Sequence, residues 1–239
     1  MPIIVVRSAE FTQLHVLQAA ADHLREWFGP SSGVGVSPID GRRPMFPEEE
    51  AHVQRAVSRR RDEFSTGRWC ARQALAELGE PFGPIPVGPL RNPVWPEGFT
   101  GSISHTDGGC AAVVARCAAW KAVGIDLLDR DAAATLPAGA GRFLTHRHED
   151  LAASASAPAW VPPLALLFSA KEAAIKALSP CLQRFVDFHD IRLQFDEGAF
   201  TATLDGAEMK VAGWWTTVLD KLIVTGAAMN AKTAKTAKS

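Results

Sequence analysis

The sequence predicts an α/β (α+β) fold made of two similar halves related by a pseudo-twofold axis. In each half a long helical segment accompanies short strand-like runs, and the two halves meet near Trp120, although no sequence repeat accompanies the pattern. The 239 residues, 47% of them hydrophobic, suffice for one large domain or two small ones. A chain of this size buries roughly 70% of the surface that its unfolded form exposes, so the core needs no disulfide or structural metal.

The first half, residues 1–118, is predicted to begin with a strand at Met1–Arg7. The next segment, Phe11–Phe28, places apolar residues on one side of a helix and ends at Gly-Pro-Ser-Ser-Gly, after which we expect a polar loop. Pro47–Leu78 is predicted as one long helix, because three acids open it and a Gly-x-Pro sequence closes it. Pro84–Pro96 is so rich in Pro and Gly that it is predicted as a loop.

A predicted hairpin then leads into the second half, residues 119–228. The two strands of the hairpin are separated by Thr-Asp-Gly-Gly, which favours a turn. We expect the last residues, 229–239, to form a solvated, disordered end. The predicted strands are Gly101–Ser104, Cys110–Ala115, Ala122–Leu127, Ile191–Phe195, Ala199–Leu204 and Leu222–Ala227, and the predicted helices are Phe143–Ala153 and Leu164–Leu178.

Composition and charge argue against several classes of protein. The net charge of −1 provides no overall field for nucleic acid or for an anionic membrane surface. No apolar run approaches the ~20 residues that a membrane helix needs. The N-terminus lacks the basic flank and cleavage pattern of a signal peptide, and the four cysteines form no C-x-x-C pair. We therefore expect a cytoplasmic protein whose thiols are reduced and buried.

Two acidic positions suggest a metal site. Asp126 ends an otherwise apolar strand, where it either meets a metal or another cation, or simply caps the next segment or ends the strand at solvent. Glu172 and Lys176 lie four residues apart on one helical face, and they form either a surface ion pair or a charged face directed into a specific site. If Asp126 and Glu172 share a site, two oxygen donors beside a lysine suit Mg²⁺ that bridges a phosphate.

Six arginines between positions 55 and 72 form either a solvated face or a phosphate site. We favour the phosphate site, because Arg61, Arg68 and Arg72 align within about 60° of one stripe on a regular helix. Guanidinium groups are the preferred partners of phosphate. His105 follows a strand-like run and is either structural or a hydrogen-bond donor to that phosphate. His146 is interpreted as a surface residue.

Four segments of the chain occur in a characteristic order. They are R-R-D-E-F-x-x-G-R-x-x-A-R from Arg60, P-x-W-P-x-G-x-x-G-S-I-S-H from Pro93, G-I-D from Gly124 and F-S-A-K-E-A-x-x-K-A from Phe168. Together they resemble the 4′-phosphopantetheinyl transferases of the Sfp and enterobactin-synthase-component type. The common phosphate-loop, dinucleotide-binding and serine-hydrolase motifs do not occur in the sequence.

The resemblance implies an enzyme that transfers the phosphopantetheine arm of coenzyme A to a serine of an apo acyl or peptidyl carrier protein. Adenosine 3′,5′-bisphosphate is the second product, Mg²⁺ is the implied cofactor, and coenzyme A is expected in the cleft between the two halves of a monomer. Asp126, Glu172 and Lys176 match the family's catalytic positions, with Asp126 and Glu172 as the Mg²⁺ ligands. The positions that match coenzyme A contacts are Arg60, Arg68, Ser104, His105, Lys171 and Lys176.

One departure from the family concerns the metal ligands. The family usually has a second acid two residues after the aspartate, where this chain has Leu128, so either water or Asp129 would take that place. The general base is either Glu172 or a bound water. Two other functions stay open, namely an anion- or nucleic-acid-binding module that uses the arginine-rich helix and a metal-dependent phosphohydrolase. The pathway served also stays open, with fatty-acid, polyketide, nonribosomal-peptide and siderophore synthesis as the candidates.

Overall fold

The computed structural model describes residues 8–137, 139–146, 149, 157–207 and 209–231. The predicted opening strand at Met1–Arg7 lies outside the described residues, as do residues 232–239 of the predicted disordered end. That prediction is wrong for residues 229 and 230, which belong to the last strand of the fold. Most of the predicted helix Phe143–Ala153 lies outside them as well. Its described part is helical only as far as Leu144.

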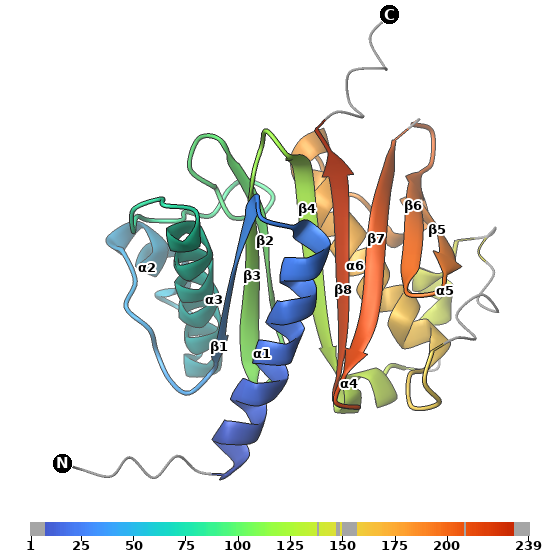
Figure 1. Cartoon of the computed structure of the whole chain (residues 1–239), viewed down its shortest axis with the longest axis horizontal. Coiled ribbons are helices and arrows are strands. Elements are labelled where there is room, and N and C mark those ends of the chain that lie inside the picture. Colours follow the sequence, from blue (N-terminus) through green and yellow to red (C-terminus); the bar gives the residue numbers. More distant parts are fainter. Residues whose placement is uncertain (1–7, 138, 147–148, 150–156, 208, 232–239) are drawn as a thin grey trace, which may run out of the picture.

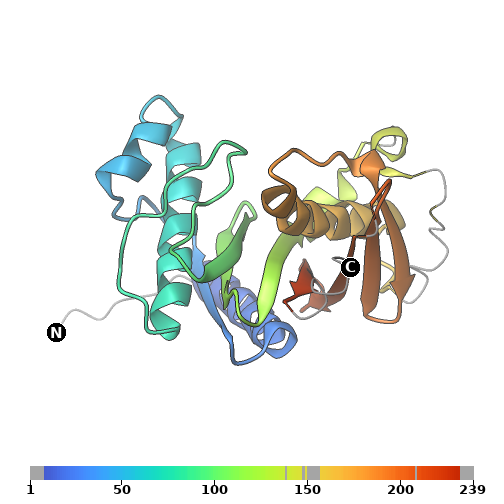
Figure 2. The same ribbon diagram turned by 90° about the horizontal axis from the view of Figure 1, so that it is seen from above.

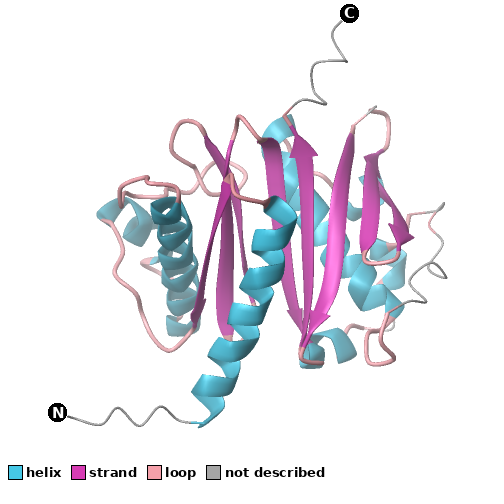
Figure 3. Cartoon of the chain, viewed as in Figure 1, coloured by secondary structure: helices cyan, strands magenta, loops and turns pink. Residues whose placement is uncertain are grey.

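Two antiparallel sheets form the centre of the molecule (Figures 1 and 3). The first has three strands in the order β1-β3-β2, and the second has five in the order β4-β8-β7-β6-β5. Tryptophan 120 begins β4, so the chain passes from the first sheet to the second there. The strands are β1 (Ser32–Pro38), β2 (Phe99–His105), β3 (Gly109–Arg116), β4 (Trp120–Asp129), β5 (Ile191–Asp196), β6 (Ala199–Leu204), β7 (Lys210–Val218) and β8 (Leu222–Asn230).

Helices cover both faces of these sheets (Figure 2). One helix, α1 (Ser8–Phe28), crosses one face and packs on strands of both sheets, whereas α3 (Ser58–Glu77) and α6 (Pro163–Leu182) lie on the other face, one against each sheet. This arrangement confirms the predicted α/β fold of two halves. The shorter helices are α2 (Pro47–Val53), α4 (Arg130–Ala134), α5 (Gly141–Leu144) and the 3-10 helix η2 (Phe188–Asp190).

Helices α3 and α6 each approach their sheet at a glycine. A Cβ atom at Gly35 of β1 would lie 2.1 Å from the carbonyl oxygen of Cys70 in α3, and one at Gly124 of β4 would lie 1.9 Å from that of Ala173 in α6. Only glycine permits so close a contact between backbones. Because Asp126 lies two residues after Gly124 on the same face of β4, this contact brings Asp126 beside α6.

Strands β2 and β4 belong to different sheets but lie side by side at the junction of the two halves. The hydroxyl oxygens of Ser102 and Ser104 accept hydrogen bonds from the backbone N–H groups of Ile125 and Leu127, at 3.0 and 3.1 Å. These serines are two residues apart, so both hydroxyls project from the same face of β2. Side chains rather than a backbone ladder therefore satisfy the edge of β4.

The predicted helix Pro47–Leu78 is wrong, because α2 and α3 are separate helices with a turn at residues 54–57. The turn allows Glu49 of α2 to pair with Arg72 of α3, with Arg72 Nη1 at 2.7 Å from Glu49 Oε1. In one continuous helix these two residues would lie about 35 Å apart. A buried ion pair thus accounts for the break.

Three further expectations need correction. The expected polar loop after Phe28 contains strand β1, and strand β7 was not predicted. Helix α6 does not end before Ser-Pro but continues to Leu182, because a proline in the last turn has helical φ and removes only one backbone hydrogen bond. The four cysteines are free, as predicted, but Cys117 is exposed rather than buried.

None of the described helices has the length and hydropathy that a bilayer-spanning helix requires.

Candidate active site

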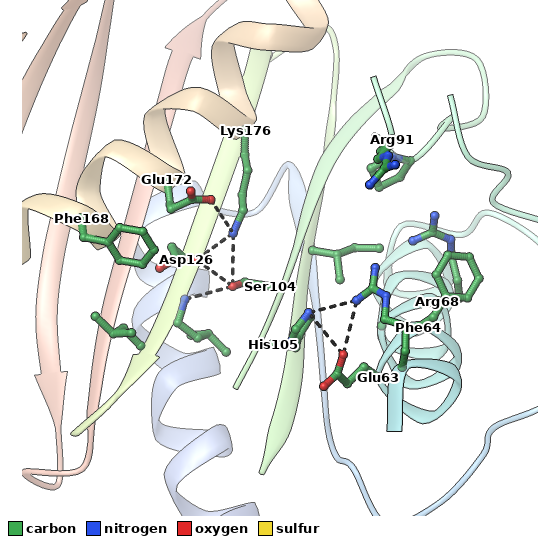
Figure 4. A pocket seen from close by; sticks show the side chains of 16 residues that line it. Glu63, Phe64, Arg68, Arg91, Ser104, His105, Asp126, Phe168, Glu172 and Lys176 are labelled. Atoms are coloured by element: carbon green, nitrogen blue, oxygen red, sulfur yellow. Dashed lines mark hydrogen bonds and ion pairs between the residues drawn. The ribbon is translucent and has the colours of Figure 1, made fainter. Parts of the chain in front are cut away.

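A cavity of about 430 Å³ lies at the junction of the two halves (Figure 4). One side is formed by α3 and by the loop that carries Arg91, and the other by β4 and α6, with the end of β2 between them. Arginine side chains line the first side, whereas Asp126, Glu172 and Lys176 line the second. The cavity therefore joins the arginine-rich segment to both predicted metal ligands.

Asp126 is the most deeply placed acid of the cavity, with 7% of its surface exposed. Its Oδ1 accepts hydrogen bonds from Lys176 Nζ at 2.7 Å and from Ser104 Oγ at 3.0 Å, and its Oδ2 accepts one from Ser169 Oγ at 2.9 Å. These donors offset the cost of burying the carboxylate. Asp126 therefore neither ends the strand at solvent nor caps the next segment, since β4 continues to Asp129 and Asp129 caps α4.

Lys176 lies between the two acids of the cavity. Its ammonium nitrogen is 3.9 Å from Glu172 Oε2 and 3.1 Å from the carbonyl oxygen of Ile125, in addition to its contact with Asp126. Burial raises the pKa of Glu172, the charge of Lys176 lowers it, and the charge of Asp126 raises it. The Glu172–Lys176 pair thus faces a cavity that also contains a second carboxylate, so it is not an ordinary surface ion pair.

Two of the three acids that line the cavity, Asp126 and Glu172, form a two-carboxylate set, whereas Glu63 lies beside Arg60 and His105. Among the described residues, no three His, Cys, Asp or Glu side chains form a metal-binding group. Leu128 lines the cavity without a donor, and Asp129 is directed elsewhere, because its Oδ1 accepts a hydrogen bond from the backbone of Ala132 at the start of α4. Two carboxylates that share one cation still fit Mg²⁺, which commonly takes one or two carboxylates and completes its shell with water and phosphate oxygens.

Arg68 provides a buried cation on the opposite side. It is 5% exposed, its Nε donates to the carbonyl oxygen of Ile85 at 2.8 Å, and its guanidinium lies 4.4 Å from the centre of the Phe64 ring. Burial lowers the pKa of Arg68 to about 10, so the group is charged at neutral pH. A desolvated guanidinium is a strong partner for phosphate because its field is weakly screened.

Arg60 and His105 complete this side of the cavity. Arg60 Nη1 is 3.4 Å from His105 Nε2 and 3.4 Å from Glu63 Oε2. Partial burial lowers the pKa of His105, Glu63 raises it and Arg60 lowers it. The imidazole is therefore mostly uncharged at neutral pH and gains charge most easily when an anion binds beside it.

The structure does not bring Lys171 to the cavity. This residue has no exposed surface; its Nζ lies 2.9 Å from Glu149 Oε1 and donates to the carbonyl oxygen of Leu144 at 2.6 Å. Consecutive residues differ by about 100° around a helix, so Lys171 and Glu172 face different directions. The assignment of Lys171 to coenzyme A binding therefore lacks support from the geometry, and its contacts are those of a residue that fixes α6.

The predicted arginine stripe is also divided. Of its three members only Arg68 lines the cavity, because Arg72 is paired with Glu49 and the guanidinium of Arg61 donates to the backbone of Gln54. Ser104, assigned by resemblance to the nucleotide end, has its hydroxyl on Asp126. The expectation for His146 is wrong as well, since it is 5% exposed.

Several cavity residues were not identified from the sequence. Phe168 lies four residues before Glu172, and this helical spacing would have placed it on the same face. Arg91 has φ of 59° in a turn closed by the hydrogen bond from Gly88 N to Asn92 O at 2.8 Å, and no periodic pattern predicts it. Ser169, which bonds to Asp126, was likewise missed.

The class of protein to which this two-sheet fold and charged cavity belong is given by comparison with known families. Family models match the chain over residues 48–115, as the 4′-phosphopantetheinyl transferase N-terminal domain, and over residues 122–225, as the 4′-phosphopantetheinyl transferase superfamily. The chain therefore belongs to the 4′-phosphopantetheinyl transferases and is an enzyme, which confirms the resemblance.

Three relatives illustrate the match. The chain is 42% identical over 172 residues to 4′-phosphopantetheinyl transferase Svp of Streptomyces mobaraensis, an alignment that covers 70% of this chain and 69% of the relative. It is 34% identical over 185 residues to 4′-phosphopantetheinyl transferase PptT of Mycobacterium tuberculosis, covering 77% and 75%. It is 38% identical over 128 residues to enterobactin synthase component D of Escherichia coli K12, covering 53% and 59%.

Proposed function

We propose that this enzyme transfers the 4′-phosphopantetheine arm of coenzyme A to a serine of an apo acyl or peptidyl carrier protein. The reaction requires Mg²⁺ and releases adenosine 3′,5′-bisphosphate. One observation carries the proposal: cations from the first half and the Asp126, Glu172 and Lys176 group from the second line the same cavity. A phosphoryl-transfer site needs mainly correct positioning and neutralisation of negative charge, which this combination supplies.

The nucleotide end of coenzyme A binds on the arginine side of the cavity. Arg60, Arg68 and His105 hold the 3′-phosphate, with the buried guanidinium of Arg68 as the strongest contact. Ser104 acts through Asp126, because its hydroxyl donates to Oδ1 and so orients the carboxylate. The cationic side of the cavity thereby selects substrates that carry a phosphate at this position.

The pyrophosphate binds between the two sides of the cavity. Asp126 and Glu172 are the residues that would hold Mg²⁺, and the bound ion would neutralise the charge of the pyrophosphate oxygens. Lys176 adds a positive charge from the α6 side, where its ammonium nitrogen lies between both carboxylates. The oxygen of the carrier serine attacks the phosphorus next to the pantetheine arm, and the electron pair of the broken P–O bond leaves with adenosine 3′,5′-bisphosphate.

Glu172 accepts the proton of the attacking serine, directly or through a water. Burial and the nearby Asp126 raise the pKa of this carboxyl, and the charge of Lys176 lowers it. A raised pKa makes a carboxylate a better general base, but a Mg²⁺ ion held by Glu172 would lower that pKa again, so a bound water is the alternative acceptor of the proton. Side-chain exposure of 29% leaves Glu172 accessible to a carrier protein that approaches from solvent.

A direct modification assay tests this function. The enzyme is incubated with coenzyme A, Mg²⁺ and a panel of apo acyl and peptidyl carrier proteins, and the mass of each carrier is measured. The proposal requires a carrier whose mass increases by one phosphopantetheine arm on serine, and it requires that an Asp126→Asn variant fails to produce it. Release of product without a carrier identifies a phosphohydrolase, and no reaction with any carrier leaves only an anion-binding module. Light scattering and cell fractionation test the monomeric, cytoplasmic state that the proposal includes.

A further inference from the structure

Three buried charged residues occupy the interface of α2 and α3 behind the cavity. Glu49, Arg68 and Arg72 are 0%, 5% and 2% exposed, so one negative and two positive side chains share a desolvated region. Their sum is one positive charge, and its location depends on which arginine pairs with Glu49. Arg68 lines the cavity, whereas Arg72 does not.

Arg72 is the arginine that pairs with the acid. Its Nη1 donates to Glu49 Oε1 at 2.7 Å, and its Nη2 donates to the carbonyl oxygen of Pro44 at 2.8 Å. The same Oε1 accepts a hydrogen bond from the backbone of Ile85 at 2.8 Å. The carbonyl oxygen of Ile85 in turn accepts the Nε proton of Arg68. The backbone of Ile85 therefore links the two side chains, with its N–H bound to Glu49 and its carbonyl oxygen bound to Arg68.

These hydrogen bonds use only the Nε atom of Arg68, so the two Nη atoms of its guanidinium can bind a ligand. Among the described residues, no side chain or carbonyl accepts from its two Nη atoms. Burial lowers the pKa of Arg68, and Glu49 is the neighbouring charge that opposes this shift, while Arg72 and Arg60 reinforce it. Glu49 is thus close enough to influence Arg68, yet it makes its ion pair with Arg72.

We propose that Arg72 and Glu49 are positioning residues that direct the surplus positive charge of this buried group to Arg68 and hold its guanidinium toward the 3′-phosphate. Without Arg72, Arg68 is the remaining buried arginine whose charge Glu49 influences, and an Arg68–Glu49 pair would withdraw the cation from the ligand. The inference rests on the proposed assignment of Arg68 to the 3′-phosphate. It adds that an arginine outside the cavity determines selectivity for that phosphate.

Binding of coenzyme A and of 3′-dephospho-coenzyme A by calorimetry tests the inference. The quantity of interest is the ratio of the two dissociation constants, because a general loss of stability changes both constants alike. Arg72→Met is expected to reduce the preference for coenzyme A about 10-fold, the usual scale for one charge-assisted hydrogen bond. The double variant E49Q/R72M removes both charges together and is expected to regain most of the preference.

Two further variants make the result decisive. Arg42→Met is the matched control, since Arg42 pairs with Glu50 on the exposed side of α2, and it should keep the wild-type ratio. If R72M does not fold, Arg72→Lys keeps the charge but cannot donate to both Glu49 and Pro44, and a partial loss of preference is expected. A wild-type ratio in R72M, or in R72K where R72M does not fold, overturns the inference. If the wild type itself shows no preference, or Arg68→Met keeps it, the proposed role of Arg68 fails instead.

Discussion

Replacing Lys176 by methionine tests whether its ammonium group occupies the position of the metal ion. In the free enzyme the nitrogen has four oxygen neighbours, from Asp126 at 2.7 Å, Ile125 at 3.1 Å, Ser104 at 3.3 Å and Glu172 at 3.9 Å. Both proposed metal ligands are therefore engaged with an internal cation. We predict that Mg²⁺ competes with Lys176 for Asp126, so that the ion binds the free enzyme weakly and binds well only together with the pyrophosphate.

The size of the effect follows from the burial of Asp126. Removing one partner of a buried ion pair costs roughly 3–5 kcal/mol, and we expect about 3 kcal/mol because Lys176 itself is 28% exposed. Mg²⁺ at about 100 times its dissociation constant would restore about 2.7 kcal/mol. For a chain of this length about 1 kcal/mol corresponds to roughly 2–4 °C, so Mg²⁺ should raise the Tm of Lys176→Met by about 5–11 °C.

Thermal unfolding measures this shift without any catalytic turnover. Wild type, K176M and the exposed-lysine control K221M are melted in MgCl2 and in NaCl with a chelator at matched ionic strength. We expect a large Mg²⁺-dependent rise in K176M and a small one in both wild type and K221M. Equal shifts in K176M and wild type would show that the lysine does not exclude the ion, and no shift in K176M would refute the two-carboxylate site.

Four other perturbations test the site and its support. Asp126→Ala should abolish transfer while the far-UV circular dichroism is retained, and full activity in excess Mg²⁺ would contradict its role as ligand. Gly124→Ala places a Cβ atom 1.9 Å from the carbonyl oxygen of Ala173, so urea unfolding should show a loss of about 1–3 kcal/mol or more. Ser102→Ala leaves a buried N–H without an acceptor and should cost about 1–3 kcal/mol in the same assay. The lowered pKa of His105 leaves the free imidazole neutral at pH 7.5, and a bound phosphate dianion raises that pKa, so coenzyme A binding should take up a proton and strengthen as the pH falls. Calorimetry in buffers of different ionisation enthalpy should detect this uptake, and an unchanged uptake in H105Q would exclude His105 as its source.

Helical spacing predicted the acid-bearing side of the cavity well. Glu172 and Lys176 are four residues apart and do share a face, and Phe168, one turn earlier, follows the same rule. The rule also shows why Lys171 could not join them, because adjacent residues differ by about 100°. At Lys171 the prediction from family resemblance disagrees with the helical geometry. Its contacts with Glu149 and two backbone carbonyls hold the buried side of α6.

Local sequence cannot predict contacts between distant segments. Arg68 and Arg72 are equivalent on one helical stripe, and what distinguishes them is Glu49, which reaches α3 only because the chain turns at residues 54–57. Strand β1 was missed for a related reason. Its Ser-Gly-Val-Gly-Val sequence resembles a loop, yet the glycines are present because α3 packs against the backbone there.

The junction of the two sheets explains why the cavity has an arginine-bearing side and an opposite side that carries Asp126, Glu172 and Lys176. Each half holds its own helix against a glycine-containing strand, and the halves meet where the hydroxyls of Ser102 and Ser104 bind β4. Ser104 accepts from the backbone of Leu127 and donates to Asp126, so one hydroxyl both joins the sheets and orients the proposed metal ligand. Any shift of one half against the other must therefore change the hydrogen bonding of Asp126. The geometry of the site is in this sense a property of the junction, which neither half could form alone.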